Sequence, residues 1–269
     1  MNTHDTEITQ IGIIVIQSLS KEDRKTGEEL TKDVLQYKKY LQKNSFVEFY
    51  NVTTTAEFIK TLRTINKSMS KGTIFSLHFE THGSEEGIHL ASGEYIKWKE
   101  FYALIRPINI KMGHLLIIVM AMCKGGSLIS SLEPEKRAPY LAFIGAFRNI
   151  TENEIVRAFN AFYTNYTGPS DIDKGMEALN MEIDGKNPKK KTFWIYSSEH
   201  VFDQVLNPDL NPDNVKKMVK EQLAKRLIEH GELGHTWASV EYEIRNHLIN
   251  TSKKYRDYYC FKDFFEKQS

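Results

Sequence analysis

The sequence predicts an α/β fold in which a mostly parallel sheet of about six strands carries helices on its faces. Short apolar runs bounded by glycine, such as residues 73–79 and 115–122, are typical of strands buried on both sides. Segments with apolar residues at helical spacing alternate with these runs. The resulting order in the first half of the chain, β-α-β-α-β, favours a parallel sheet because parallel neighbours need a crossover helix.

The first half of the chain divides into alternating strands and helices. Thr54 and Glu57 have the spacing of a capping box, which predicts that a helix begins there. The expected strands are residues 11–16, 46–50 and 73–79, and the expected helices are residues 27–43 and 54–68.

The second half continues the same pattern. Pro107 predicts the end of a helix, and the pair Gly125-Gly126 predicts a sharp turn from a strand into a helix. The expected elements are a short hairpin at 87–98, helices at 99–108, from 124, 151–167 and 170–181, and strands at 115–122, 140–146 and 192–196.

Beyond residue 198 the chain is predicted to be helical. Segments 199–206, 212–230 and 237–250 have helical patterns, and the tail is rich in Tyr and Phe. We therefore expect residues 1–198 to form the main domain. Residues 199–269 are expected to form a helical extension whose aromatic side chains pack it on that domain. A separate small C-terminal domain is the alternative.

Composition excludes several classes of protein. The 269 residues carry 36 Lys and Arg against 35 Asp and Glu, which argues against a general nucleic-acid surface. No apolar run approaches the ~18 residues of a membrane span, and the polar N-terminus lacks a signal-peptide core. The two cysteines, Cys123 and Cys260, do not suggest a disulfide scaffold. We therefore expect a reducing, cytoplasmic location.

Chemically useful residues follow two of the predicted strands. The strand at 73–79 leads into His82-Gly83, and the strand at 115–122 leads into Cys123 and the glycine pair. Because parallel strands end at the same sheet edge, a thiol and an imidazole are expected to meet there as a Cys-His nucleophilic site. A lone cysteine more often fills a core, but here the matching His-Gly strand end favours catalysis.

His78 and His82 do not indicate a metal site. Their spacing is that of a zinc-binding His-Glu-x-x-His motif, but the glutamate, Glu80, stands one place late. On a strand, residues at i and i+4 lie ~13 Å apart, which is too far to share an ion. We expect His78 to pack inside the sheet, and we expect neither a metal nor another cofactor.

The two strand ends resemble those of the caspase-like cysteine peptidases, including caspases, metacaspases and bacterial relatives. In that group an apolar strand ending in His-Gly precedes an apolar strand ending in Cys-x-Gly-Gly, as His82 and Cys123 do here, 41 positions apart. The resemblance spans residues 12–196 and implies a caspase-like three-layer sandwich. The short hairpin after His82 is similar to that of the bacterial members.

The resemblance also implies roles for individual residues. Cys123 would be the nucleophile, His82 the base, and the backbone N–H groups of Gly83 and Cys123 the oxyanion hole. The substrate would be a protein or peptide, and bacterial relatives imply a partner protein in signalling or defence, with an activating partner possible. A third residue orienting His82 is not identified by the sequence.

Specificity is where the chain departs from the better-known members. Two positions before the nucleophile, caspases have Gln and metacaspases have Asp, whereas this chain has Ala121. Ala cannot pair with a basic substrate side chain, so we expect a pocket for an apolar or small residue. Recognition of Asp would need arginines, and Arg24 and Arg148 are the candidates because each follows a predicted strand.

Two other functions remain open from the sequence alone. The same Cys-His pair could hydrolyse an amide in a non-protein substrate. Alternatively, the chain could be a catalytically inactive caspase-like scaffold that only binds partners.

Overall fold

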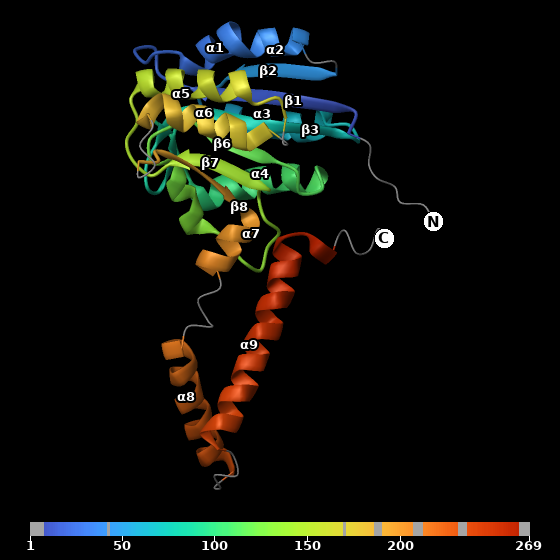
Figure 1. Ribbon diagram of the computed structural model, residues 1–269, viewed down its shortest axis with the longest axis vertical. Helices are drawn as coiled ribbons and strands as arrows, with labels where there is room; N and C mark the ends of the chain where they lie inside the picture. Colours follow the sequence, from blue (N-terminus) through green and yellow to red (C-terminus); the bar gives the residue numbers. More distant parts are fainter. Residues whose placement is uncertain are drawn as a thin grey trace.

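The computed structural model describes residues 8–41, 44–168, 171–185, 190–206, 212–230 and 236–263. Its centre is one twisted sheet with strand order β2-β1-β3-β6-β7-β8 (Figure 1). The pairs β1–β2, β1–β3, β3–β6 and β6–β7 are parallel, and β8 runs antiparallel to β7. These strands are Gln10–Ser18 (β1), Ser45–Asn51 (β2), Thr73–Gly83 (β3), Ile117–Met120 (β6), Ala142–Ala146 (β7) and Phe193–Ser197 (β8).

A small hairpin extends the end of β3. Its strands, Gly87–His89 (β4) and Tyr95–Lys97 (β5), pair with each other, and β4 also pairs with β3. The short hairpin expected after His82 is therefore present, and it lies at the carboxyl edge of the sheet.

Helices cover both faces of the sheet and produce the three layers. One face packs on α3 (Thr55–Ser68) and α4 (Trp98–Lys111), where Phe58 and Phe101 contact Phe79 of β3. The other face packs on α1 (Thr26–Leu30), a π-helical turn (Thr31–Leu35), α2 (Gln36–Leu41), α5 (Glu152–Asn165) and α6 (Ile172–Asp184). The α/β three-layer sandwich is thus confirmed.

Alternate residues of β1 explain why both faces need a helical cover. Ile14 and Ile16 join the apolar cluster beneath α3 and α4, whereas Ile13 and Val15 join the cluster beneath α1 and α5. A strand that is apolar on both sides can be buried only between two layers.

Two local expectations were wrong. Pro107 lies inside α4 rather than at its end, because Ile105 and Ile108 are fully buried and hold that turn against the sheet. After Cys123 the chain forms only a 3-10 helix (Gly125–Ser131), and the left-handed residue at the turn is Lys124, with φ 55°, rather than a glycine.

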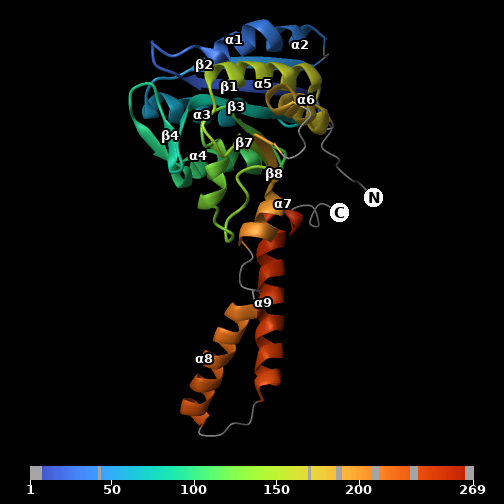
Figure 2. The same ribbon diagram turned by 60° about the vertical axis from the view of Figure 1, so that its left-hand side comes forward.

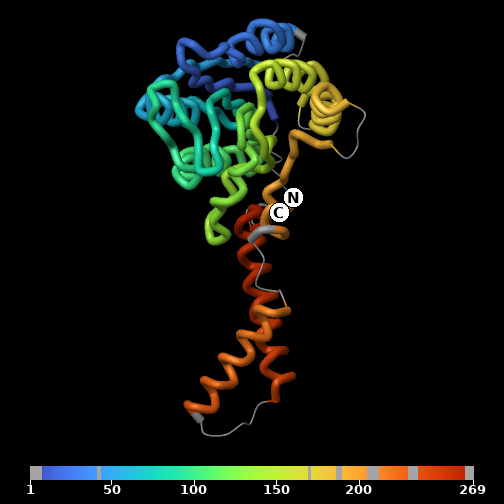
Figure 3. Tube along the Cα trace, turned by 90° about the vertical axis from the view of Figure 1, so that its left-hand side faces the viewer, coloured from blue at the N-terminus to red at the C-terminus, as the bar shows by residue number. Residues whose placement is uncertain are grey.

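The C-terminal extension consists of α7 (Ser198–Val201), a π-helical turn (Phe202–Leu206), α8 (Pro212–His230) and α9 (Trp237–Tyr259). Helices α8 and α9 form a hairpin that projects away from the sheet (Figures 2 and 3). The hairpin has its own apolar cluster of Val215, Val219, Val240 and Leu248. Of the described helices, none combines the length and apolar character that a membrane span requires.

The extension contacts the main body through its aromatic end. Tyr259 and Phe261 pack with Ala138 and Phe202, and the guanidinium of Arg137 lies 4.7 Å from the centre of the Phe261 ring. The expected aromatic docking therefore involves the last turn of α9, while most of α8 and α9 lies away from the domain. The division at residue 198 stays a prediction.

Candidate active site

The register of β3 and β6 brings the ends of the two strands together. Each paired residue of β3 lies opposite the residue 41 positions later, from Ser76 with Ile117 to Phe79 with Met120. His82 and Cys123 have this same separation, and both follow the last paired residues of these strands, Phe79 and Met120. A methyl group on Gly83 would stand 2.2 Å from the carbonyl oxygen of Cys123. The His-Gly and Cys segments are therefore in direct contact.

The imidazole of His82 is held from the loop after β1. Its Nε2 atom lies 3.0 Å from Oδ2 of Asp23, and the same oxygen accepts a 2.8 Å hydrogen bond from the Ser20 N–H. Burial alone would raise the pKa of the Asp23 carboxyl, but the hydrogen bonds from His82 and Ser20 outweigh it, so the pKa is lowered. The His82 side chain is 59 % exposed and thus accessible to a substrate.

The thiol of Cys123 is partly buried and contacts the segment after β7. Its Sγ accepts a hydrogen bond from the Ile150 N–H at 3.2 Å and donates to the Ile150 carbonyl at 3.4 Å. The N–H of Lys124 bonds to the Arg148 carbonyl at 3.1 Å, which fixes the same two segments together. Two contacts of its thiol thus hold Cys123 against the segment that follows β7.

Of the site residues proposed from sequence, His82, Gly83 and Cys123 come together, whereas Ala121 does not reach a surface. Ala121 is 1 % exposed and belongs to the apolar cluster under α5. Ala121 directly follows β6, and its side chain packs in that cluster rather than at a surface.

The two candidate arginines are already paired. Arg24 donates to Glu29 at 2.7 Å and to Asn153 at 2.7 Å. Arg148 donates to Glu154 at 2.7 Å and to Thr192 at 3.1 Å, and this pairing lowers the pKa of Glu154 to about 2. Both guanidinium groups are therefore already engaged by carboxylates, and their part in substrate binding stays a prediction.

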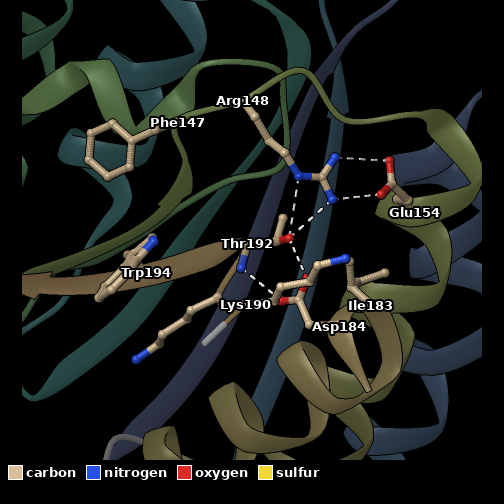
Figure 4. Close-up of a pocket in the computed structure, with 9 residues that line it drawn as sticks. Phe147, Arg148, Glu154, Ile183, Asp184, Lys190, Thr192 and Trp194 are labelled. Carbon is tan, nitrogen blue, oxygen red and sulfur yellow. Dashed lines mark hydrogen bonds and ion pairs between the residues drawn. The ribbon is translucent and has the colours of Figure 1, made fainter. Parts of the chain in front are cut away.

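A pocket of about 730 Å³ lies between the segment after β7, the end of α6 and β8 (Figure 4). Its lining residue Arg148 is linked to the Cys123 segment, because the Arg148 carbonyl accepts a hydrogen bond from the Lys124 N–H. Its carboxylates are engaged: Glu154 holds Arg148, and Asp184 accepts from the Thr192 N–H at 2.8 Å. Lys190 and Lys191 are exposed there, and Lys191 Nζ lies 4.9 Å from the centre of the Trp194 ring. The lining residues are Phe147, Arg148, Glu154, Ile183, Asp184, Lys190, Lys191, Thr192 and Trp194.

His78 lies inside the sheet, as expected. It is 0 % exposed, and its ring meets the Phe159 ring edge-on at 5.0 Å. Within the described residues, no group of three or more His, Cys, Asp or Glu side chains is arranged to hold a metal ion.

Sequence reasoning missed Asp23. The available signal was its position after β1, because β1 neighbours β3 and ends at the same edge. Several polar residues share that loop, however, and spacing alone does not distinguish among them.

Comparisons with known proteins agree with the fold and the strand ends. The Peptidase C13 family model matches residues 14–142, a span that includes both His82 and Cys123. No curated protein matches the sequence. The structure is similar to the crystal structure of the Drosophila initiator caspase Dronc, with a TM-score of 0.51 and 12 % sequence identity. That match covers 73 % of this chain and 82 % of the Dronc chain.

Proposed function

We propose that this chain is a caspase-like cysteine peptidase, a hydrolase, and that it cleaves peptide bonds in a partner protein with Cys123 as nucleophile and His82 as base. The observation that carries this proposal is the contact between the two strand ends. Gly83 lies so close to the Cys123 carbonyl that only a glycine fits, so the His82-Gly83 segment packs against the backbone of the proposed nucleophile.

The reaction would follow the chemistry of a Cys-His pair. His82 takes the thiol proton, and the thiolate attacks the scissile carbonyl carbon to form a tetrahedral oxyanion. The oxyanion accepts hydrogen bonds from the N–H groups of Gly83 and Cys123. As the C–N bond breaks, the imidazolium protonates the leaving amine, and water then hydrolyses the thioester with His82 as base.

Asp23 would act as the positioning residue of this pair. Its carboxylate binds Nε2 of His82, which leaves Nδ1 as the ring nitrogen for the thiol. The Sγ of Cys123 must rotate from Ile150 toward the imidazole and substrate, and rotation about a single side-chain bond achieves this.

The pocket that Arg148 and Trp194 line would receive a substrate side chain near the scissile bond. Phe147 and Trp194 are each 39 % exposed and supply apolar walls, while Lys190 and Lys191 supply positive charge. Because the carboxylates are already engaged, an acidic substrate side chain fits this pocket better than a basic one.

The cellular setting is proposed from the resemblance and the thiols. Bacterial relatives suggest a signalling or defence pathway with a protein substrate. Both cysteines are free, which suits a reducing compartment such as the cytoplasm.

The test compares cleavage of a proteome-derived peptide library by the wild-type protein, Cys123→Ala and His82→Ala. We expect a set of cleaved bonds with the wild type that both variants lose. Cys260→Ser is the matched control, because Cys260 is buried, which raises the pKa of its thiol to about 11 and makes it unreactive at neutral pH. Identical cleavage by the wild type and Cys123→Ala would overturn the proposal.

A covalent probe checks the same assignment without a known substrate. A peptidyl chloromethyl ketone should label Cys123 and leave Cys260 unmodified, as read by peptide mass mapping. Labelling of Cys123 that is equally fast in His82→Ala would mean that the imidazole does not activate the thiol.

A further inference from the structure

Strand β3 carries an unusual row of buried polar side chains. Ser76, His78 and Glu80 are 2 %, 0 % and 1 % exposed, and their period of two places them on one face of the strand. The intervening residues Phe75, Leu77 and Phe79 are apolar and face α3 and α4. One face of a central strand is therefore polar where most protein cores are apolar.

Each member of this row has a hydrogen-bond partner. Ser76 Oγ lies 3.2 Å from the Tyr166 hydroxyl, and His78 Nδ1 lies 3.1 Å from the Tyr163 hydroxyl. His78 Nε2 lies 2.8 Å from Oε1 of Glu80. The other carboxyl oxygen of Glu80 accepts a 2.7 Å hydrogen bond from the Thr26 hydroxyl.

The row leads directly to the proposed base. His82 is the next residue at the same spacing, and it emerges from the core to meet Asp23. Burying a carboxylate in a core is unfavourable relative to an apolar side chain of similar size. Apolar packing therefore does not explain why a glutamate stands at position 80. Its hydrogen bond with Thr26 does, because this bond links β3 to the start of α1.

Thr26 is the first residue of α1 and follows the loop that carries Asp23. Two further bonds fix the same turn, because Gln17 Oε1 accepts from the Gly27 N–H at 3.0 Å and the Glu28 N–H at 3.1 Å. A methyl group on Gly27 would lie 2.9 Å from Cγ of Glu80, so the helix start packs directly on this carboxylate. The position of Asp23 thus depends on the contact between Thr26, three residues further along the chain, and Glu80.

We propose that Glu80 and Thr26 are positioning residues for the His82–Asp23 pair. Glu80 holds the start of α1 to the strand that carries His82, so the loop presents Asp23 to the imidazole at a fixed distance. This inference rests on the proposed function, in which His82 activates Cys123.

The experiment measures the rate at which iodoacetamide alkylates Cys123 at pH 7, with peptide mapping to separate it from Cys260. Thr26→Val removes the hydroxyl but keeps the volume, and we expect alkylation about 10-fold slower because the imidazole is displaced. Thr26→Ser restores the hydroxyl and should restore the rate.

Tyr166→Phe is the matched control. It removes one buried hydroxyl from the far end of the same row, so it should lower the melting temperature about as much as Thr26→Val does. Its alkylation rate should equal that of the wild type. A purely structural role for Thr26 would make the two variants alike in both measurements, and that result would overturn the inference.

A second pair of variants covers the case in which Thr26→Val does not fold. Glu80→Gln keeps an oxygen that accepts from Thr26 and should retain the rate, whereas Glu80→Leu removes the acceptor and should slow alkylation about 10-fold. Equal rates in these two variants would also contradict the inference. Failure of the proposed function is distinguishable, because then even His82→Ala would alkylate as fast as the wild type.

Discussion

The Nε2 atom of His82 lies 3.0 Å from Oδ2 of Asp23, although the two residues are 59 positions apart in the sequence. The sheet explains the encounter. Asp23 follows β1, His82 is the last residue but one of β3 and Cys123 follows β6, and these three strands are parallel neighbours in the sheet. Because parallel strands have their carboxyl ends at one edge of the sheet, a carboxylate, an imidazole and a thiol arrive there in that order.

The first prediction concerns this carboxylate. Asp23→Ala should lower kcat/KM about 10- to 100-fold, with the loss mainly in kcat, because the imidazole loses its orientation. Asp23→Asn keeps an oxygen that can accept from Nε2 and should lose less. Steady-state kinetics on a peptide found in the cleavage screen provides the measurement.

Glu22→Gln is the control for Asp23, since Glu22 is exposed and lies in the same loop. It removes one negative charge without touching the imidazole and should retain the wild-type kcat. If Asp23→Ala behaved like Glu22→Gln, Asp23 would have no positioning role.

The second prediction concerns the close approach at Gly83. Gly83→Ala would place its methyl group 2.2 Å from the Cys123 carbonyl oxygen, so the strand ends must separate. We expect kcat to fall on the order of 100-fold, as when an oxyanion donor is lost. Rapid-quench or continuous assays of peptide hydrolysis measure the change.

Gly168→Ala serves as the comparison for Gly83→Ala, because the added methyl group there meets nothing within 4 Å. This variant should keep both its activity and its melting temperature. Full activity of Gly83→Ala would show that the strand ends need not touch for catalysis.

The third prediction concerns the pocket that Lys190 and Lys191 line. The double substitution Lys190→Glu and Lys191→Glu reverses the charge of its exposed cations. Cleavage sites with Asp or Glu near the scissile bond should become poorer substrates by about 10-fold or more, because like charges then meet in the pocket. Sites with Lys or Arg should improve.

Lys60→Glu provides the control for the pocket, since Lys60 is exposed on α3, on the other side of the sheet. It changes the net charge without changing the pocket and should leave the cleavage profile intact. An unchanged profile in the double variant would mean that Lys190 and Lys191 do not select the substrate.

Sequence reasoning could locate His82 and Cys123 because each follows an apolar strand and precedes a glycine. It could not select Asp23, because Ser18, Ser20 and Glu22 are equally polar members of the same region. Two features of the folded chain place Asp23, and not its neighbours, against His82. One is the register of β1 on β3, in which Ser18 lies opposite Thr81, and the other is the hydrogen bond from the Ser20 N–H to Asp23. Neither can be read from residue types.

The same limit applies to the C-terminal helices. The sequence shows the helical spacing of their apolar residues, but it does not show which part of the protein packs against that apolar face. Val215 and Val219 of α8 pack with Val240 of α9, so the two helices cover each other rather than the sheet.

The pairing of Arg148 could not be predicted for a related reason. Its ion pair with Glu154 depends on a turn that only the folded chain forms.

The last prediction concerns stability in acid and the buried His114. Its Nδ1 lies 3.1 Å from the Asn109 amide nitrogen, and its Nε2 lies 3.0 Å from Ser198 Oγ. The Asn109 amide is fixed in this orientation, since its oxygen accepts from the Leu116 N–H and its nitrogen donates to the Ala138 carbonyl. Nδ1 must therefore accept, and the ring is neutral.

Burial, reinforced by the nearby Arg137, lowers the pKa of His114 to about 4 from an ordinary value of 6.5. Between these two values the unfolded chain binds the proton and the folded chain does not, so stability rises with pH across that window. The contribution is complete above about pH 6.5 and disappears toward pH 4. It amounts to about 3 kcal/mol of unfolding free energy.

Urea unfolding of the wild type and His114→Gln at pH 7, 5.5 and 4.5 measures this contribution. The glutamine has no proton to bind, so the variant should lose less stability than the wild type as the pH falls. The gap between the two proteins should therefore narrow steadily toward pH 4.5. His89→Gln, which replaces an exposed histidine, should run parallel to the wild type. A constant gap for His114→Gln would show that His114 takes up a proton in the folded state as readily as in the unfolded one, contrary to the hydrogen-bond pattern that Asn109 imposes.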